Sequence, residues 1–231
     1  MYSPLNFETR FRAPFSALVV GATCSGKSEF IFKLIRERRN MIDKKIDRIV
    51  YCYSEWQAGY EKIQKECEIE FLQGLGEILE NPNFFDAKVC TLLILDDLQR
   101  AVAEDTRTAK IFTQYLHHKN VCCCLILQNL FVQGKAMRDI HLNSQYLVLF
   151  KSVRDVSQIS ILARQMGLPH IVEAYRTATS EPYSALLLDL KPDSPEYLRV
   201  RSHFLPDQYT RIYLKKNSAS LPKPCRTESS A

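Results

Sequence analysis

Apolar side chains occur along this chain in short blocks, and the spacing within each block predicts its conformation. Short continuous apolar runs indicate strands buried on both faces, as in a parallel sheet. Such runs lie at 15–20, 47–53, 91–97, 121–127, 146–150 and 185–190, and a shorter alternating run spans 68–71. We therefore expect a strand at each of these places.

Helical spacing separates many of these runs. Apolar residues recur at intervals of three and four within 29–38, which predicts a helix there, and further helices are expected at about 107–118, 156–165 and 170–177. Glycine and proline interrupt 74–88, so this segment is expected to be loop with weak helix, and 129–143 is expected to be a loop. Strands alternating with helices predict an α/β fold whose central sheet is mostly parallel and flanked by helices.

The turn between the first strand and the first helix carries a phosphate-binding motif, G-x-x-x-x-G-K-S. It consists of Gly21, Ala22, Thr23, Cys24, Ser25, Gly26, Lys27 and Ser28. In such a loop the backbone N–H groups point at phosphate oxygens, and the helix dipole adds partial positive charge. We expect the loop to bind ATP, Lys27 to reach the β- and γ-phosphates, and Ser28 to hold Mg²⁺ through its hydroxyl.

Two carboxylates end the apolar run at 91–97. Asp96 and Asp97 fall at the carboxyl end of a buried strand, which is the edge where open α/β sheets bind ligands. We expect Asp96 to hold the Mg²⁺ shell and Asp97 to orient or deprotonate the attacking water. The alternative for Asp97 is a helix N-cap for the segment that begins near Leu98.

A polar side chain ends the next strand as well. Val121 to Leu127 is apolar, and Gln128 and Asn129 follow it. Gln128 is expected to face the γ-phosphate beside Asp97 and to sense whether it is present. The alternative is ordinary polarity at the start of a loop.

An arginine supplied by a neighbouring subunit would complete such a site. Ring-forming triphosphatases place an arginine at the subunit boundary, where it stabilises charge on the neighbour's γ-phosphate. Arg154 follows a strand at the ligand edge and is our candidate, with Arg138 and Arg164 as rivals. The alternative for each is a surface salt bridge.

Length and composition agree with one domain. The chain has 231 residues, 46% of them hydrophobic and 25% charged, which suits one large α/β domain at residues 1–212. Residues 213–231 are basic and rich in serine and proline, and we expect a disordered tail. No long uncharged apolar stretch and no signal-peptide layout occurs, so we expect an intracellular, soluble protein without a membrane partner.

Cysteine usage argues against a zinc site. Cys122, Cys123 and Cys124 are consecutive in a strand and cannot all face one metal, and none of the eight cysteines forms a C-x-x-C pair. We expect reduced thiols that act as small hydrophobic residues. Cys24 is the exception, because its place in the phosphate loop favours a reactive thiol that mild oxidation could modify.

The net charge of +5 is mildly basic, and the basic residues cluster. Groups lie at 10–12, at 36–48 and at 211–226, and Lys135 and Arg138 follow Gln128. Nucleic-acid contact is one interpretation. Solvated helix ends, where Lys and Arg complement the helix dipole, are the other.

Taken together, these residues carry a resemblance to a known family. The order G-A-T-C-S-G-K-S, L-L-I-L-D-D-L and C-L-I-L-Q-N-L-F resembles the FtsK–HerA superfamily. Further runs, Y-L-H-H-K-N, L-N-S-Q-Y-L-V-L-F-K and R-D-V-S-Q-I-S-I-L-A-R-Q-M, are similar to poxvirus-type genome-packaging ATPases, especially those of Polinton (Maverick) elements and adintovirus-like DNA viruses. The similarity spans about residues 10–205.

The resemblance implies a RecA/FtsK-like fold of the additional-strand type and an ATP-driven motor. It implies a homo-oligomeric ring that pumps double-stranded DNA into a capsid at the viral assembly site in the host cell, with a capsid vertex protein as a further partner. By matching position it gives Lys27 and Ser28 the nucleotide, Asp96 the metal and Gln128 the sensor. Two departures stand out: Asp97 replaces the more usual Glu, and Cys24 replaces Gly or another small residue.

Two other functions use the same loop. A kinase of a small molecule or nucleoside needs an acceptor pocket and an arginine-bearing lid, and no clear lid segment is visible in the sequence. The other is a non-catalytic nucleotide-binding scaffold or switch. The pair Asp96 and Asp97 favours hydrolysis.

Overall fold

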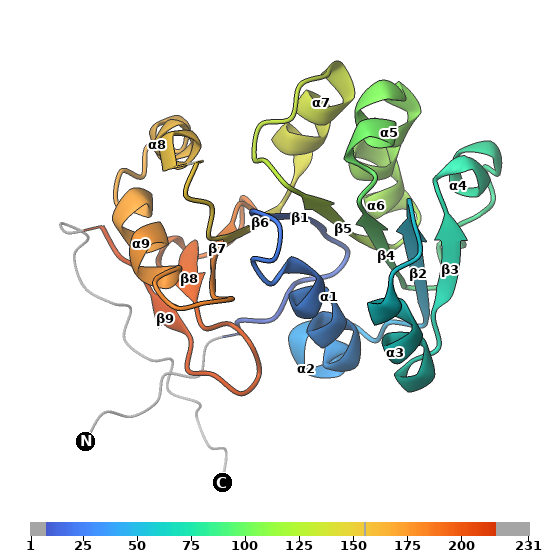
Figure 1. Cartoon of the computed structure of the whole chain (residues 1–231), viewed down its shortest axis with the longest axis horizontal. Helices are drawn as coiled ribbons and strands as arrows, with labels where there is room; N and C mark the ends of the chain where they lie inside the picture. The colour runs from blue at the N-terminus through green and yellow to red at the C-terminus, as the bar shows by residue number, and fades with distance from the viewer. Residues whose placement is uncertain (1–7, 155, 216–231) are drawn as a thin grey trace, which may run out of the picture.

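The computed structural model describes residues 8–154 and 156–215, which form one sheet with helices on both faces (Figure 1). Within these residues nine strands pair in the order β3-β2-β4-β5-β1-β6-β7-β8-β9. The strands are β1 (Ser16–Val20), β2 (Arg48–Tyr53), β3 (Glu70–Gln73), β4 (Thr91–Asp96), β5 (Val121–Leu127), β6 (Tyr146–Phe150), β7 (Ala185–Asp189), β8 (Val200–Ser202) and β9 (Arg211–Ile212).

The sheet is parallel from β3 to β6 and antiparallel from β6 to β9. This confirms the predicted α/β fold with a mostly parallel sheet. Strand β5 lies between β1 and β4, so an additional strand separates the phosphate-loop strand from the acid strand. The carboxyl ends of β1, β5 and β4 therefore lie side by side at one edge of the sheet.

The helical segments vary in length and type. They are α1 (Lys27–Arg36), α2 (Arg38–Met41), α3 (Ala58–Glu66), α4 (Gly76–Glu80), α5 (Gln99–Glu104), the 3-10 turn η1 (Thr106–Thr108), the π-helical turn η2 (Ile111–Tyr115), α6 (Leu116–His118), α7 (Lys135–Asn143), α8 (Val156–Gln165), α9 (Ile171–Ala178) and the 3-10 turn η3 (Glu196–Leu198). In the described part of the chain, none is long and apolar enough to cross a membrane.

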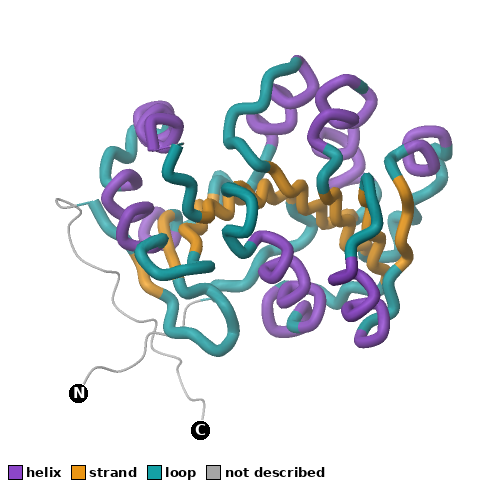
Figure 2. Tube along the Cα trace, viewed as in Figure 1, coloured by secondary structure: helices purple, strands orange, loops and turns teal. Residues whose placement is uncertain are grey.

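Helices lie on both sides of the sheet, as the tube view in Figure 2 shows, and a hydrophobic layer packs on each face. Helices α1 to α3 pack on one face, and α4 to α9 pack on the other. Strand residues alternate between the layers: Leu93 and Leu95 of β4 face the second group, and Leu92 and Ile94 face the first. This alternation places Asp96 on the face of α1 and α3.

The structure corrects several sequence expectations. Residues 135–143 form helix α7 and not a loop, because Ala136, Met137 and Ile140 recur at helical spacing and pack in the core. The expected helix at 107–118 is a succession of 3-10, π and α turns. The sequence did not predict α2, α3, β8 or β9. Beyond Lys215 the expected tail lies outside the described residues.

The cysteine interpretation is confirmed for β5. Cys123 packs in one layer and Cys122 and Cys124 in the other, so the three thiols face opposite sides of the sheet. Burial raises the pKa of the Cys124 thiol to about 12, which keeps it protonated and inert.

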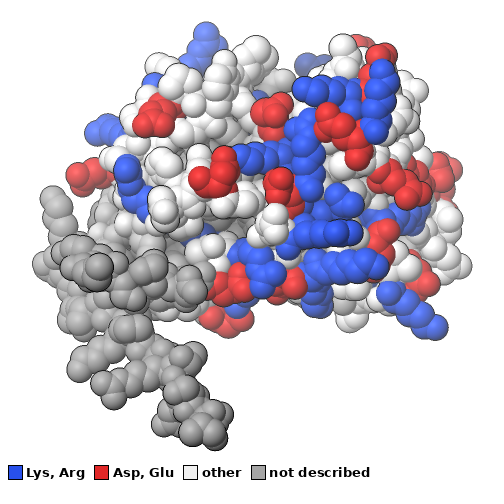
Figure 3. Space-filling model, turned by 90° about the horizontal axis from the view of Figure 1, so that it is seen from below, with Lys and Arg blue, Asp and Glu red and all other residues white. Residues whose placement is uncertain are grey.

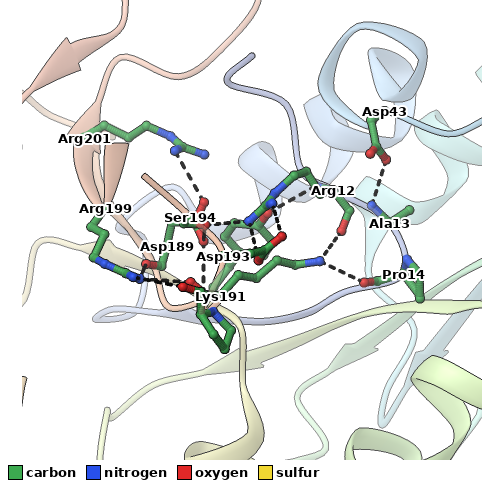
Figure 4. Close-up of polar contacts among 12 residues, drawn as sticks. Arg12, Ala13, Pro14, Asp43, Asp189, Lys191, Asp193, Ser194, Arg199 and Arg201 are labelled. Carbon is green, nitrogen blue, oxygen red and sulfur yellow. Dashed lines mark hydrogen bonds and ion pairs between the residues drawn. The ribbon is translucent and has the colours of Figure 1, made fainter. Parts of the chain in front are cut away.

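Charged side chains link the antiparallel edge of the sheet to the N-terminal segment: Lys191, for example, donates to the carbonyls of Arg12 and Pro14 (Figure 4). The guanidinium of Arg201 is 1% exposed and lies 3.6 Å from Asp189, while it also donates to the carbonyls of Leu198 and Thr9. Nearby, Arg12 forms a bidentate pair with Asp193. This cluster lies at the end of the sheet opposite the phosphate loop, so we assign it to stability.

We expect Asp189→Ala to lower the free energy of unfolding by about 3 kcal/mol, because it leaves the Arg201 charge buried without its partner. Asp193→Ala is the matched control. The Asp193 side chain is 73% exposed, so its loss should leave the unfolding midpoint nearly unchanged. Urea denaturation measures both variants, and equal midpoints for the two would contradict the expected cost.

Candidate nucleotide-binding site

The phosphate loop leaves β1 beside the end of β5. The Gly21 N–H donates to the carbonyl of Leu127 at 3.2 Å, which ties the start of the loop to the end of β5. A Cβ at Gly21 would lie 2.6 Å from the Cβ of Phe150 and 2.7 Å from the Ser25 hydroxyl. Only glycine allows this close approach, so the tight path of the loop depends on it.

The loop contains two residues in the left-handed region. Gly26, directly before α1, has φ +106, and Cys24 has φ 60. Glycine adopts this conformation without cost, whereas a side-chain-bearing residue such as Cys24 is strained there. The Cys24 thiol is exposed and therefore accessible to oxidants.

Cys24→Gly should raise the free energy of unfolding by about 1 kcal/mol, because it removes the left-handed strain. Thr23→Gly is the matched control. Thr23 has no positive φ, so glycine there only adds entropy to the unfolded chain and should destabilise. Thermal unfolding measures both, and a Cys24→Gly protein less stable than the wild type would contradict the strain.

Lys27 is the first residue of α1 and is 9% exposed. Its ammonium donates to the carbonyls of Gly21 and Ala22, both at 2.7 Å, so it lies across the loop. Burial lowers its pKa, while the nearby Asp96 carboxylate and the Cys24 thiol oppose that shift. Lys27 and Asp96 are therefore electrostatic neighbours, as expected for two parts of one phosphate site.

The inside of the loop fits a phosphate group. The N–H groups of Thr23, Cys24 and Gly26 donate to no backbone carbonyl within the described residues. The buried Ser25 hydroxyl likewise has no hydrogen-bond partner there. Free donors at a helix N-terminus are what an anion needs.

Asp96 is held firmly at the end of β4. It is 5% exposed, and its Oδ2 accepts hydrogen bonds from the hydroxyls of Tyr51 at 2.6 Å and Tyr60 at 3.0 Å. Burial raises the pKa of both tyrosines, and the Asp96 charge raises it further, so both hydroxyls stay protonated donors. The carboxylate is thus fixed in direction.

Asp97 differs from Asp96 in backbone conformation and in exposure. Its backbone has φ 54, its side chain is exposed, and its Oδ2 accepts a hydrogen bond from the Ser54 hydroxyl at 3.0 Å. Leu98 holds the N-cap position of α5 without a side-chain bond, so Asp97 does not cap that helix. The carboxylate stands in solvent at the ligand edge, where it can bind a water molecule.

The remaining candidates are exposed. Gln128 follows β5 directly, and its N–H lies 3.4 Å from the side-chain oxygen of Gln99 on α5, while its own side chain faces solvent. Arg154 follows β6 with an exposed side chain. The topology thus brings Gln128 to the edge that carries Asp96 and Asp97, and it places Arg154 on the far side of β1.

The oxygen donors fit a magnesium ion. Asp96 offers a carboxylate with one oxygen fully engaged by tyrosines, and Ser28 offers a half-buried hydroxyl in the first turn of α1. The described residues contain no cluster of three or more His, Cys, Asp or Glu side chains suited to a metal. Mg²⁺ characteristically uses one or two protein oxygens together with phosphates, so this donor set suits it.

A cavity of about 370 Å³ opens beside Gly26. Its walls come from the first turns of α1, the end of β6 and two later loops, and they include Phe30, Phe150, Tyr183, His203 and Phe204. Tyr183 and His203 have φ 62 and 54, and such strain in side-chain-bearing residues gathers at ligand sites. This cavity could not be predicted from the sequence, because the residues of its walls are far apart in the chain.

Sequence reasoning also missed the hydroxyls that hold the acids. Tyr51, Ser54 and Tyr60 belong to β2, the turn after it and α3. A tyrosine inside an apolar run needs a hydrogen-bond partner once buried, which is the one signal that pointed toward Tyr51.

Comparison with known proteins identifies solved structures of similar fold. No protein-family model matches the sequence, and no curated protein matches it. The genome packaging NTPase B204 from Sulfolobus turreted icosahedral virus 2, solved with AMPPCP, is similar at a TM-score of 0.53 and 12% identity over 87% of this chain and 97% of that chain. B204 from Sulfolobus turreted icosahedral virus, a DNA-packaging ATPase, is similar at 0.51 and 12% over 87% and 98%.

A secretion ATPase shares the fold too. The cytoplasmic domain of the type VII secretion ATPase EccC from Thermomonospora curvata is similar at a TM-score of 0.52 and 16% identity, over 81% of this chain and 25% of that chain. At these identities the likeness establishes a shared fold. The chain therefore has the α/β fold of P-loop ATPases, as the sequence predicted.

Proposed function

We propose that this protein hydrolyses ATP as the subunit of a ring-shaped motor that moves double-stranded DNA into a viral capsid. The proposal places it among poxvirus-type packaging ATPases of the FtsK–HerA superfamily, near those of Polinton elements and adintovirus-like viruses. Its place of action is the viral assembly site in the host cell, with a capsid vertex protein as partner.

One observation carries the proposal. The phosphate loop, the acid pair and Gln128 end three neighbouring strands, β1, β4 and β5, so they share one edge of the sheet. A nucleotide bound in the loop would have its γ-phosphate facing both acids and the amide. The shared fold with packaging NTPases supports the same conclusion.

The chemistry follows from the positions of these side chains. Asp97 holds the attacking water, and Lys27 stabilises negative charge on the β- and γ-phosphates. Ser28 and Asp96 would hold Mg²⁺, and the metal would supply positive charge against the phosphate oxygens. Gln128 contacts the γ-phosphate and couples its presence to the loop before α7.

The cavity beside Gly26 is the place for the nucleoside. It adjoins the loop at the start of α1, and aromatic walls such as Phe30 and Tyr183 offer apolar faces to a purine ring. Its volume of about 370 Å³ suits a base with its ribose. This supports a nucleotide substrate and not a bare phosphate ester.

DNA contact is best assigned to α7. Figure 3 shows Lys and Arg in a band on the face of α1 to α3, with Asp and Glu among them. Basic residues on this face are paired locally: Arg36 of α1, for example, forms an ion pair with Glu66 of α3. Local pairing reduces the field available to DNA. Lys135 and Arg138, in contrast, are exposed one turn apart on α7, directly after the Gln128 loop.

Phosphate release with and without double-stranded DNA, run beside a sizing measurement, tests the function. We expect hydrolysis that DNA stimulates and that needs the oligomer. Phosphate transfer to a small acceptor would favour a kinase instead. Nucleotide binding without turnover, even in the oligomer with DNA, would favour a switch and overturn the motor.

Subunit mixing tests Arg154. If Arg154 acts on the neighbouring subunit's γ-phosphate, inactive Arg154→Ala subunits mixed with inactive Asp97→Asn subunits should regain part of the wild-type activity, because some interfaces then hold an intact arginine and an intact acid. Arg164 on the exposed side of α8 is the rival candidate, so Arg164→Ala subunits are mixed with Asp97→Asn subunits in the same way. Recovery with neither Arg154→Ala nor Arg164→Ala mixtures would remove both residues from the role.

A further inference from the structure

Two tyrosines from different elements converge on a single oxygen of Asp96. The Tyr51 hydroxyl of β2 donates to Oδ2 at 2.6 Å, and the Tyr60 hydroxyl of α3 donates to the same atom at 3.0 Å. Both tyrosines are almost fully buried, at 0% and 1% exposure. Any buried carboxylate needs hydrogen-bond donors, and donors can be shared between its two oxygens. Here both donors contact the same oxygen.

The two oxygens of the Asp96 carboxylate therefore have different surroundings. A carboxylate oxygen has two lone-pair sites, so Oδ2 is saturated by the two hydroxyls. Oδ1 accepts no hydrogen bond from the described residues. Turning the carboxylate plane away from the tyrosines would cost both hydrogen bonds, so one of its two equivalent oxygens stays on the tyrosines and the other points away from them.

Ring packing fixes the hydroxyls in turn. The rings of Tyr51 and Tyr60 lie 5.0 Å apart, and Phe71 of β3 packs against both at 5.3 and 5.7 Å. Phe32 of α1 contacts the same two rings. Because α1 begins at Lys27, one aromatic cluster joins the acid strand to the helix that carries the phosphate loop.

We propose that Tyr51 and Tyr60 are positioning residues that present Oδ1 of Asp96 to the metal shell of the bound nucleotide. The inference rests on the proposed function, in which Asp96 holds Mg²⁺. Neither tyrosine touches the nucleotide or the metal. They act through Asp96, as partners behind metal-binding carboxylates commonly do, and their loss weakens metal-dependent binding.

Binding of a fluorescent ATP analogue, measured with Mg²⁺ and with EDTA, tests this without relying on turnover. We expect Mg²⁺ to tighten binding by the wild type. In Tyr51→Phe, the affinity with Mg²⁺ should fall about tenfold. In Tyr60→Phe it should fall less, because the hydrogen bond from Tyr60 to Asp96 is longer. Binding in EDTA should stay at the wild-type value in both.

Tyr53→Phe is the matched control. Tyr53 packs against Tyr60 and Phe71 in the same cluster, so the variant removes one hydroxyl from these rings while both hydrogen bonds to Asp96 remain. It should keep the full gain from Mg²⁺. Thermal unfolding of all three variants identifies any that loses its fold, and Tyr60→Phe, with the longer bond, remains as a second test if Tyr51→Phe unfolds.

The possible results separate cleanly. If Tyr51→Phe and Tyr60→Phe unfold at lower temperature but keep the Mg²⁺ gain, the hydroxyls serve stability only and the inference is wrong, while the ATPase proposal stands. If the wild type binds ATP equally well with and without Mg²⁺, Asp96 does not hold a metal beside the nucleotide, and the inference is wrong. If the wild type binds no ATP, the proposed function itself fails.

Discussion

Lys27→Ala should lower the rate of ATP hydrolysis about a hundredfold or more while the fold remains intact. Lys27 is the basic side chain inside the phosphate loop, and removing one such charge from a transferring phosphoryl group costs on this scale. Burial lowers the pKa of Lys27, so the folded protein holds this ammonium at an electrostatic cost. Its removal should therefore not destabilise the chain.

Phosphate release at saturating ATP and thermal unfolding measure the two effects separately. Lys27→Met keeps the aliphatic stem and removes only the charge, so it should be as inactive as Lys27→Ala. Lys45→Ala is the surface control, since Lys45 is 81% exposed and pairs with Asp47 far from the loop. Activity of either Lys27 variant within about threefold of wild type would show that the charge is not required.

The strands of the central sheet could be predicted because burial on both faces leaves an unmistakable apolar run. Val121 to Leu127 and Thr91 to Asp96 are fully buried along their length. The small edge strands could not be found in this way. β8 is three residues long and contains Arg201, and a charged residue inside a strand contradicts an apolar pattern. Its place in the sheet follows from antiparallel pairing with β7, where Arg201 lies opposite Leu187.

Helix α7 was mistaken for a loop for a related reason. Gly134 stands directly before the helix, and glycine after a strand is typical of a loop, so the break hid the helical spacing that follows it. Ala136, Met137 and Ile140 form a helix because they pack on the core that α5 shares. Tertiary packing decided the conformation, and local propensity did not.

Some residues of the candidate site could be predicted from the sequence, and others could not. The phosphate loop, both acids and Gln128 could be located from sequence, because each follows a recognisable strand and parallel strands end at one edge. Tyr51, Ser54 and Tyr60 could not, because their contacts with the acids exist only once β2 pairs with β4. That register sets Tyr53 opposite Asp96, which brings Tyr51 and Ser54 to either side.

The two acids should fail in different assays when each is changed to asparagine. Asp97→Asn should keep Mg²⁺-dependent ATP binding and lose turnover by about a hundredfold or more, because the amide cannot accept a proton from the water. Asp96→Asn should weaken Mg²⁺-dependent binding about tenfold or more, because the neutral oxygen is a poorer ligand for a hard cation. Binding in EDTA should be unchanged in both.

The structure makes asparagine a clean replacement at each position. Asp97 has φ 54, and asparagine tolerates the left-handed region as well as aspartate does. At Asp96 the amide oxygen can still accept from Tyr51 and Tyr60, so the buried hydroxyls keep a partner. Ser54→Ala is the control for Asp97, since it removes the hydrogen bond but leaves the carboxylate, and it should reduce turnover far less than Asp97→Asn. If the two asparagine variants lose binding and turnover to the same extent, the acids share one role, and the assignment of metal to Asp96 and water to Asp97 is wrong.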